Sequence, residues 1–203
     1  MTTETVTGPA EPVHARIPDT TAGGTVILLN GTSSSGKTSI ARELLSVLDG
    51  TWFHMPVDAF HGMRGGHALP GDDVQAEIDR TCKGFHRAVA GMAAGGNRLV
   101  VDYPLSSPWR LLDLLDLLDP QNTVLIGVHC PLPELERRER ERGDRQHGLA
   151  ATQYDHVHAH GVHDLDIDTS LHSPAECALR IRDVLTDRPR PTAFERLRRS
   201  LRP

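Results

Sequence analysis

A glycine-rich segment near the start of the chain constrains its fold more than any other feature. Residues 31–38 read GTSSSGKT and match the pattern G-x-x-x-x-G-K-[ST], the phosphate-binding P-loop. The apolar run TVILLN, typical of a buried strand, comes directly before it, and a helical pattern follows. A P-loop needs this context, because the N–H groups of the loop and the helix N-terminus bind phosphate together. The segment therefore predicts a nucleoside-triphosphate site on an α/β fold.

Within the loop, the residue types predict separate roles. The glycines let the backbone turn tightly, Lys37 is expected to reach the β- and γ-phosphates, and the Thr38 hydroxyl is expected to ligate a metal ion. The implied cofactor is Mg²⁺ with ATP or GTP, and the sequence does not choose between the two nucleotides. The predicted nucleotide-binding residues of this loop are Gly31, Thr32, Ser33, Ser34, Ser35, Gly36, Lys37, Thr38 and Ser39.

Strand and helix patterns alternate along the rest of the chain. The helices include a Leu-rich one after Ser107-Pro108 and another after Ser173-Pro174, where Ser and Pro mark a helix start. Several strand candidates are near-continuous apolar runs, as in a parallel sheet, whereas the acidic DLDID suits a sheet edge. We therefore predict a P-loop kinase-like α/β fold, a doubly wound, mostly parallel five-stranded sheet with helices on both faces and a small lid. The strand candidates are 25–30, 52–57, 98–102, 124–129 and 164–168.

The composition of the chain argues against several other classes of protein. The 203 residues carry a net charge of −5, which gives no argument for a nucleic-acid partner. Because the chain has neither an apolar run of membrane-spanning length nor an apolar signal region at its start, we expect a cytoplasmic protein. The three cysteines are far apart and are interpreted as reduced packing residues.

We divide the chain into three parts: a disordered leader at 1–24, a P-loop kinase domain at 25–186 and an arginine-rich tail at 187–203. For the tail, a short helix packed on the domain is favoured over an electrostatic docking segment. The Leu-rich helix could be core or the face of a homo-oligomer, and we favour core.

Two strand-end aspartates narrow the class of P-loop protein. The GTPase motifs D-x-x-G and N-K-x-D are missing from the sequence, and motor ATPases are usually larger, which leaves small-molecule kinases. A kinase needs one carboxylate side chain that orients and deprotonates the acceptor hydroxyl. In a parallel α/β sheet the ligands bind where the strands end, so this side chain is expected at the C-terminal end of a strand. We assign Asp58 as that base. Asp102 suits an outer-shell Mg²⁺ role or an acceptor-binding role.

A run of mixed charge, 134–145, predicts the lid. Much of it is a solvated helix face with i,i+4 pairs, but Gly143 can end the helix and release a segment over the site. Arginines from such a lid stabilise the transferring phosphoryl group. The predicted catalytic lid residues are Arg138, Arg142 and Arg145.

These segments together resemble the chloramphenicol phosphotransferase family of P-loop kinases. The likeness runs in order through ILLNGTSSSGKTSI, VDAF at 57–60, VVD at 100–102, GVHC at 127–130, RERERGDR at 138–145 and VHAHGVHDLDIDTS at 157–170. It implies transfer of a γ-phosphate to a hydroxyl of a small antibiotic, which would confer resistance, and a role for Asp168 and Thr169 in holding the nucleotide. The region 54–71 resembles the family least, so the acceptor could be chloramphenicol or another, nucleoside-type antibiotic. The predicted acceptor-binding residues are Asp58, Phe60, His61, Asp102 and Tyr103.

Two further hypotheses stay open. One is a metabolic kinase for a nucleoside or another primary metabolite, and the other is a nucleotide-dependent regulatory module. Histidines at 156, 158, 160 and 163 raise a metal site as an alternative. Three of them, at 156, 160 and 163, would share a face if the segment were a helix, but we favour a pH-sensitive lid surface.

Overall fold

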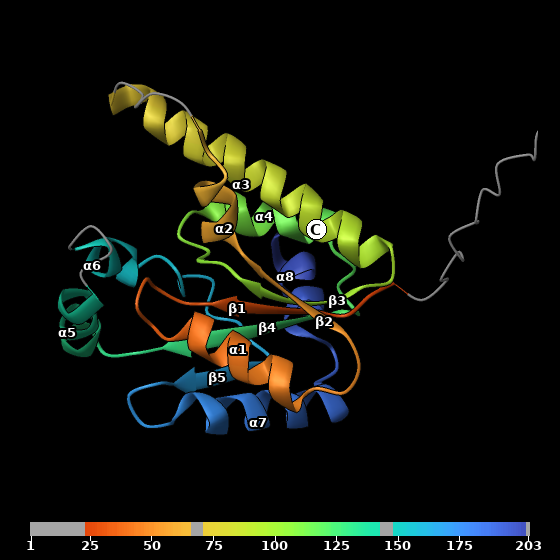
Figure 1. Cartoon of the computed structure of the whole chain (residues 1–203). Coiled ribbons are helices and arrows are strands. Elements are labelled where there is room, and N and C mark those ends of the chain that lie inside the picture. Colours follow the sequence, from red (N-terminus) through yellow and green to blue (C-terminus); the bar gives the residue numbers. More distant parts are fainter. Residues whose placement is uncertain (1–22, 66–70, 143–147, 202–203) are drawn as a thin grey trace, which may run out of the picture.

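The computed structural model describes residues 23–65, 71–142 and 148–201. These residues build a five-stranded sheet in which every neighbouring pair is parallel (Figure 1). All five predicted strands are present, and the acidic strand lies at an edge as expected. The spatial order is β2 (Trp52–Pro56), β3 (Arg98–Asp102), β1 (Val26–Asn30), β4 (Thr123–His129) and β5 (Leu165–Asp168).

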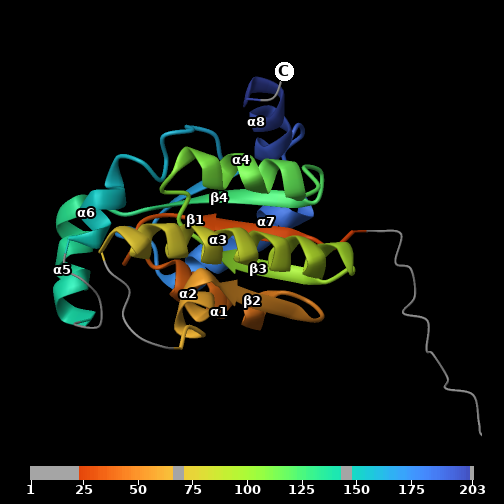
Figure 2. The same ribbon diagram turned by 90° about the horizontal axis from the view of Figure 1, so that it is seen from above.

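Helices cover both faces of the sheet, which confirms the doubly wound α/β prediction. One face carries α3 (Gly71–Ala94), α4 (Pro108–Leu117) and α8 (Ala193–Leu201), and the other carries α1 (Lys37–Val47) and α7 (Pro174–Thr186) (Figure 1). Three further helices lie beyond the carboxyl ends of the strands (Figure 2). They are α2 (Val57–Gly62), α5 (Leu132–Arg142) and α6 (Leu149–Tyr154).

Successive residues of β1 belong to two separate apolar cores. Val26 and Leu28 pack under α3 and α4, whereas Ile27 and Leu29 pack under α1 and α7. This alternation follows from the two-residue period of a strand, and it explains why the whole run is apolar. The central strand therefore loses all contact with solvent, with exposures of 0–1% from Val26 to Leu29.

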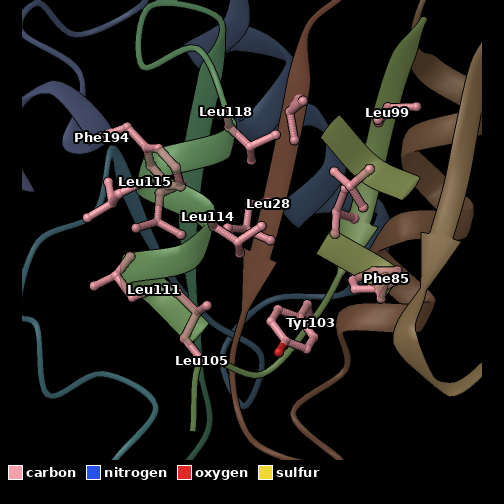
Figure 3. Packing of buried hydrophobic residues seen from close by; sticks show 14 of the residues in the cluster. Leu28, Phe85, Leu99, Tyr103, Leu105, Leu111, Leu114, Leu115, Leu118 and Phe194 are labelled. Atoms are coloured by element: carbon pink, nitrogen blue, oxygen red, sulfur yellow. The ribbon is translucent and has the colours of Figure 1, made fainter. Parts of the chain in front are cut away.

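The Leu-rich helix α4 belongs to the core, as the sequence analysis favoured. Its start matches the prediction, with Ser107 in extended conformation at the N-cap position and Pro108 in the first turn. Figure 3 shows its leucines pointing toward Leu28 and Phe194. The buried leucines of this region are Leu111, Leu114, Leu115 and Leu118.

The tail helix α8 completes the same core. Phe194 is fully buried and Leu197 nearly so, while the arginines that follow are exposed. Asp164 fixes its start, because one carboxylate oxygen accepts from Ala193 N (2.6 Å) and the other from Leu125 N (2.8 Å). The helix expected in the tail is therefore present. Residues 1–22 of the expected leader lie outside the described residues.

None of the helices within the described residues combines the length and the apolar character that a membrane span requires.

Replacing Phe194 tests how much the tail helix contributes to stability. Because the ring is fully buried in the core, Phe194→Ala should lower the free energy of unfolding by about 3–5 kcal/mol, measured by urea denaturation. Leu201, 44% exposed on the same helix, is the matched control, and Leu201→Ala should cost less than about 0.5 kcal/mol. Equal effects would mean that the helix is not part of the cooperative core.

Candidate active site

The P-loop turns tightly between β1 and α1. Ser34 has a φ of 61° and Gly36 a φ of 94°, both in the left-handed region. Gly31 allows a close approach, since a Cβ at this position would lie 2.4 Å from the carbonyl oxygen of Val128. The hydroxyl oxygens of Ser34 and Ser35 are buried and have no hydrogen-bond partner among the described residues. Of these two residues, only Ser34 lines the cavity described below.

Lys37 and Thr38 meet Asp102 at the carboxyl end of the neighbouring strand β3. Thr38 Oγ1 donates to Asp102 Oδ2 (2.5 Å), and Lys37 Nζ lies 3.8 Å from Asp102 Oδ1 while donating to the carbonyl of Thr32 (2.7 Å). All three side chains line one cavity. A cation, a hydroxyl and a carboxylate therefore converge at one point of its wall.

This cavity has a volume of about 770 Å³ and lies over the carboxyl ends of the strands. The P-loop and α1 form one part of the wall, and α2, α3 and the start of α4 form another. Asp58 and His61, both predicted for the acceptor side, line it. His61 Nδ1 is buried without a hydrogen-bond partner among the described residues, and burial is the main cause that lowers the pKa of its ring.

Two residues predicted to bind the acceptor lie in the core instead. Phe60 packs edge-on against Phe85, with ring centroids 5.0 Å apart, and neither ring lines the cavity. Tyr103 is completely buried beside the same Phe85 (Figure 3). Packing against the core therefore leaves neither ring in the lining of this cavity, and direct contact of Phe60 and Tyr103 with an acceptor stays a prediction.

Two of the three predicted lid arginines line the cavity, namely Arg138 and Arg142. Arg145 lies outside the described residues. Arg138 donates to both oxygens of Thr169, to Oγ1 (3.0 Å) and to the carbonyl (2.9 Å). The Thr169 hydroxyl in turn donates to the carbonyl of Ser35 (2.8 Å). This chain of contacts holds the middle of α5 against the P-loop.

Asp168 lies differently from its predicted partner Thr169. Its carboxylate accepts from the backbone N–H (2.8 Å) and the hydroxyl (2.6 Å) of Ser170, and it is not among the cavity-lining residues. It therefore shapes the turn after β5, and only Thr169 of this pair faces the cavity.

Four positioning residues were missed by the sequence analysis. Asn30, completely buried, donates to the carbonyl of Val157 (2.6 Å) and accepts from Leu105 N (2.9 Å). It thereby ties the loops on both sides to the end of β1. The one sign of this role in the sequence is that a polar residue, Asn30, ends an apolar strand.

The other three lie on helices or in the lid. Arg110 lines the cavity and donates to Ser106 Oγ (3.0 Å), and it could have been noticed as an arginine on a leucine face. Glu139 is buried within the charge run and accepts from the N–H of Ala150 (2.7 Å). Gln153 accepts from Ser33 N (2.7 Å), a contact that no sequence pattern indicates.

The histidines of the 156–163 segment do not share one helical face. The segment is a series of turns, in which His156 lines the cavity and His160 lies 3.2 Å from Asn30. Burial, followed by neighbouring histidines, lowers the pKa of His158 to about 3, and burial is also the first cause that lowers the pKa of His163 to about 4. These two rings are neutral at pH 7, so the expected pH-sensitive surface was wrong for them.

Comparison with known proteins identifies the family. The profile of the chloramphenicol phosphotransferase-like proteins matches residues 24–186. The chain belongs to the chloramphenicol phosphotransferase-like family. A Mycobacterium tuberculosis protein provisionally named an O-phosphotransferase is 28% identical, covering 87% of this chain and 88% of that protein.

Solved structures show the same fold. The APS kinase CysC of M. tuberculosis, in complex with AMPPNP and APS, superposes with a TM-score of 0.61 at 17% identity, covering 81% of this chain and 98% of that chain. The tunicamycin resistance protein of Deinococcus radiodurans gives a TM-score of 0.56 at 19% identity, covering 80% and 95%. This member of the chloramphenicol phosphotransferase-like family is therefore a small-molecule phosphotransferase with a P-loop kinase fold.

Asn30 offers a test of how the site is held together. Asn30→Leu keeps the branched shape of the side chain but leaves Leu105 N–H and the Val157 carbonyl buried without this partner, so the free energy of unfolding should fall by about 2–4 kcal/mol. Asn30→Asp keeps an acceptor for Leu105 but loses the donor for Val157. Asn30→Asp should therefore leave the hydrogen bond from Leu105 N intact. The free energies of unfolding of both variants are compared by urea denaturation. An unchanged midpoint in Asn30→Leu would show that these hydrogen bonds do not hold the loops.

Proposed function

We propose that the protein transfers the γ-phosphate of Mg²⁺-ATP or Mg²⁺-GTP to a hydroxyl of a small antibiotic and thereby confers resistance. One observation carries the proposal: the P-loop and Asp58 line the same cavity from different walls, with Asp102 also in the lining. A cavity of about 770 Å³ suits a nucleotide together with part of a second small molecule.

The donor half of the cavity fits a Mg²⁺-nucleotide. The hydroxyl of Ser34, which lines the cavity and has no hydrogen-bond partner among the described residues, can donate to a phosphate oxygen, beside Lys37 and the N-terminus of α1. Thr38 and Asp102 offer adjacent oxygen atoms, the ligand type that Mg²⁺ takes, and Asp102 beside Thr38 suits the metal better than the acceptor. When bound, Mg²⁺ would neutralise charge on the β- and γ-phosphates.

In the acceptor half we assign Asp58 as the general base. Its position in the first turn of α2 puts the carboxylate on the wall that also carries His61 and Arg110. The carboxylate would take the proton of the acceptor hydroxyl as the hydroxyl oxygen attacks the γ-phosphorus, and the bond from that phosphorus to the bridging oxygen would break, releasing the nucleoside diphosphate. The buried Nδ1 of His61 and the cation of Arg110 can bind polar groups of the acceptor, and Ile78 adds an apolar surface.

The lid arginines complete the mechanism. Arg138 lies beside Gly36 of the P-loop: its Nη1 is 3.8 Å from the position that a Cβ on this glycine would occupy. From there its guanidinium can stabilise the charge of the phosphoryl group during transfer. Arg142 lines the same wall one helical turn later. We also assign Arg145 as a lid arginine that stabilises the transferring phosphoryl group.

An antibiotic acceptor is favoured by the family and by the tunicamycin resistance protein among the structural relatives. The rival is a metabolic kinase, since APS kinase and shikimate kinase share the fold. Incubation with Mg²⁺-ATP or Mg²⁺-GTP and a panel of hydroxylated antibiotics and metabolites separates the two. We expect an added phosphoryl group, detected by mass, on an antibiotic. Turnover of a metabolite alone would refute the resistance proposal.

The assignment of the base predicts the effect of one substitution. Asp58→Asn keeps the side-chain shape but cannot take up the hydroxyl proton, so kcat should fall by about 10²–10⁴-fold while nucleotide affinity is kept. Asp183→Asn, on the exposed surface of α7, is the matched control and should leave kcat unchanged. A kcat for Asp58→Asn within a few-fold of wild type would eliminate Asp58 as the base, and biological activity that survives would favour a regulatory module.

A further inference from the structure

Three histidines that are distant in the sequence meet outside the active-site cavity. His129 is the last residue of β4, whereas His158 and His163 lie between α6 and β5. One ring nitrogen of each lies within 4.8 Å of one ring nitrogen of the other two. The rings of His129 and His158 are stacked, with centroids 3.9 Å apart. Within the described chain, none of the three lines the cavity, so the proposed phosphoryl transfer does not explain them.

The spacing of the nitrogens is close to that of a tetrahedral metal site. Zinc–nitrogen bonds of about 2.0–2.1 Å in tetrahedral geometry require nitrogens about 3.3–3.4 Å apart. His158 Nδ1 and His163 Nε2 are 3.4 Å apart. A ring nitrogen of His129 lies within 4.8 Å of a nitrogen of each of the other two, so the binding of one ion by all three requires the rings to move to the tetrahedral spacing.

Asp166 orients two of the three rings. Its Oδ1 lies 2.9 Å from His163 Nδ1 and 2.6 Å from His129 Nε2. A proton on His163 Nδ1 leaves the lone pair of Nε2 directed toward His158. A carboxylate that accepts from the far nitrogen of a histidine is the usual support of a metal-binding imidazole.

A glycine in the strand makes room for the group. A Cβ on Gly127 would lie 2.3 Å from Asp166 Oδ1, 2.9 Å from His129 Nε2 and 2.9 Å from His163 Cγ. Glycine inside a strand lacks a side chain to pack and is favoured where other groups approach closely. The strand therefore accommodates the histidines and Asp166 at a position where any other residue would displace them.

We propose that His129, His158 and His163 bind one divalent transition-metal ion, Zn²⁺ in the first instance, with Asp166 as the orienting carboxylate. Three imidazoles suit Zn²⁺, and three protein ligands leave a fourth position for water. The site is accessible, because the side chain of His129 is 38% exposed and that of Asp166 is 59% exposed. The proposal is independent of the proposed phosphoryl transfer.

The bound ion would join β4 to the segment between α6 and β5. The same segment is already held by Asn30 through Val157, and α6 contacts the P-loop through Gln153. Ion binding to the folded chain alone raises its stability by mass action. We therefore expect Zn²⁺ to raise the melting temperature of the chain even without nucleotide.

Zinc affinity of the full-length, untagged protein tests the site. After treatment with a chelator, Zn²⁺ is titrated against a chromophoric competitor. His129→Ala removes the most accessible ligand and should lower the affinity of one site on the order of 100-fold, since losing a supporting carboxylate alone costs about 10–100-fold. His156→Ala is the matched control, because this exposed histidine lies in the same segment but outside the group, and its zinc affinity should equal wild type.

Two further measurements separate a metal site from a hydrogen-bonded cluster. Asp166→Asn should weaken zinc binding by about 10–100-fold and leave the stoichiometry at one. The Co²⁺-loaded protein should show the intense visible absorption of a four-coordinate ion, and His129→Ala should lose it. Equal zinc affinity in wild type and His129→Ala, with no such absorption in wild type, would overturn the proposal. Circular dichroism verifies that each variant is folded.

Discussion

The complete burial of one central strand is the constraint on which the rest of the structure depends. β1 pairs with β3 on one side and β4 on the other, and both of its faces are packed under helices. Because neither edge nor face is free, the point at which the strand ends is fixed in space. The P-loop starts at that point, and its first glycine packs against the backbone of β4 at Val128. The phosphate-binding conformation is thus imposed by the sheet.

From this fixed loop the lid is positioned through backbone contacts. Ser33 N donates to Gln153 of α6, and the carbonyl of Ser35 accepts from Thr169, which also binds Arg138 of α5. The proposed acceptor side is built differently, from side chains on α2, α3 and α4. On this proposal, main-chain geometry specifies the nucleotide side and the identity of side chains specifies the acceptor side, so the sequence motif predicts the nucleotide but not the acceptor.

Features that depend on local sequence were predictable. The five strands and the P-loop follow from apolar runs and a fixed motif, and the Leu-rich helix was placed correctly in the core. Contacts between segments that are distant in the sequence were not predictable. Phe60 and Tyr103 stand next to a predicted site in sequence, but core packing turns their rings away from the cavity. In the sequence, Glu139 cannot be distinguished from the other charges of a solvated helix face. Its carboxylate is buried only because the N–H groups of Gly148 and Ala150 donate to it in the folded chain.

The histidines illustrate the same limit, and they also connect two parts of the molecule. Sequence spacing grouped His156, His160 and His163, whereas the fold joins His158 and His163 to His129, the last residue of β4. A helical pattern could not reveal this, because the third partner comes from another strand. The carbonyl of Val128 lies against Gly31; the next residue, His129, belongs to the histidine group, and the preceding residue, Gly127, lies close to it. Any ion held there acts on the strand that supports the P-loop, so its effect on stability extends to the phosphate site without touching the nucleotide.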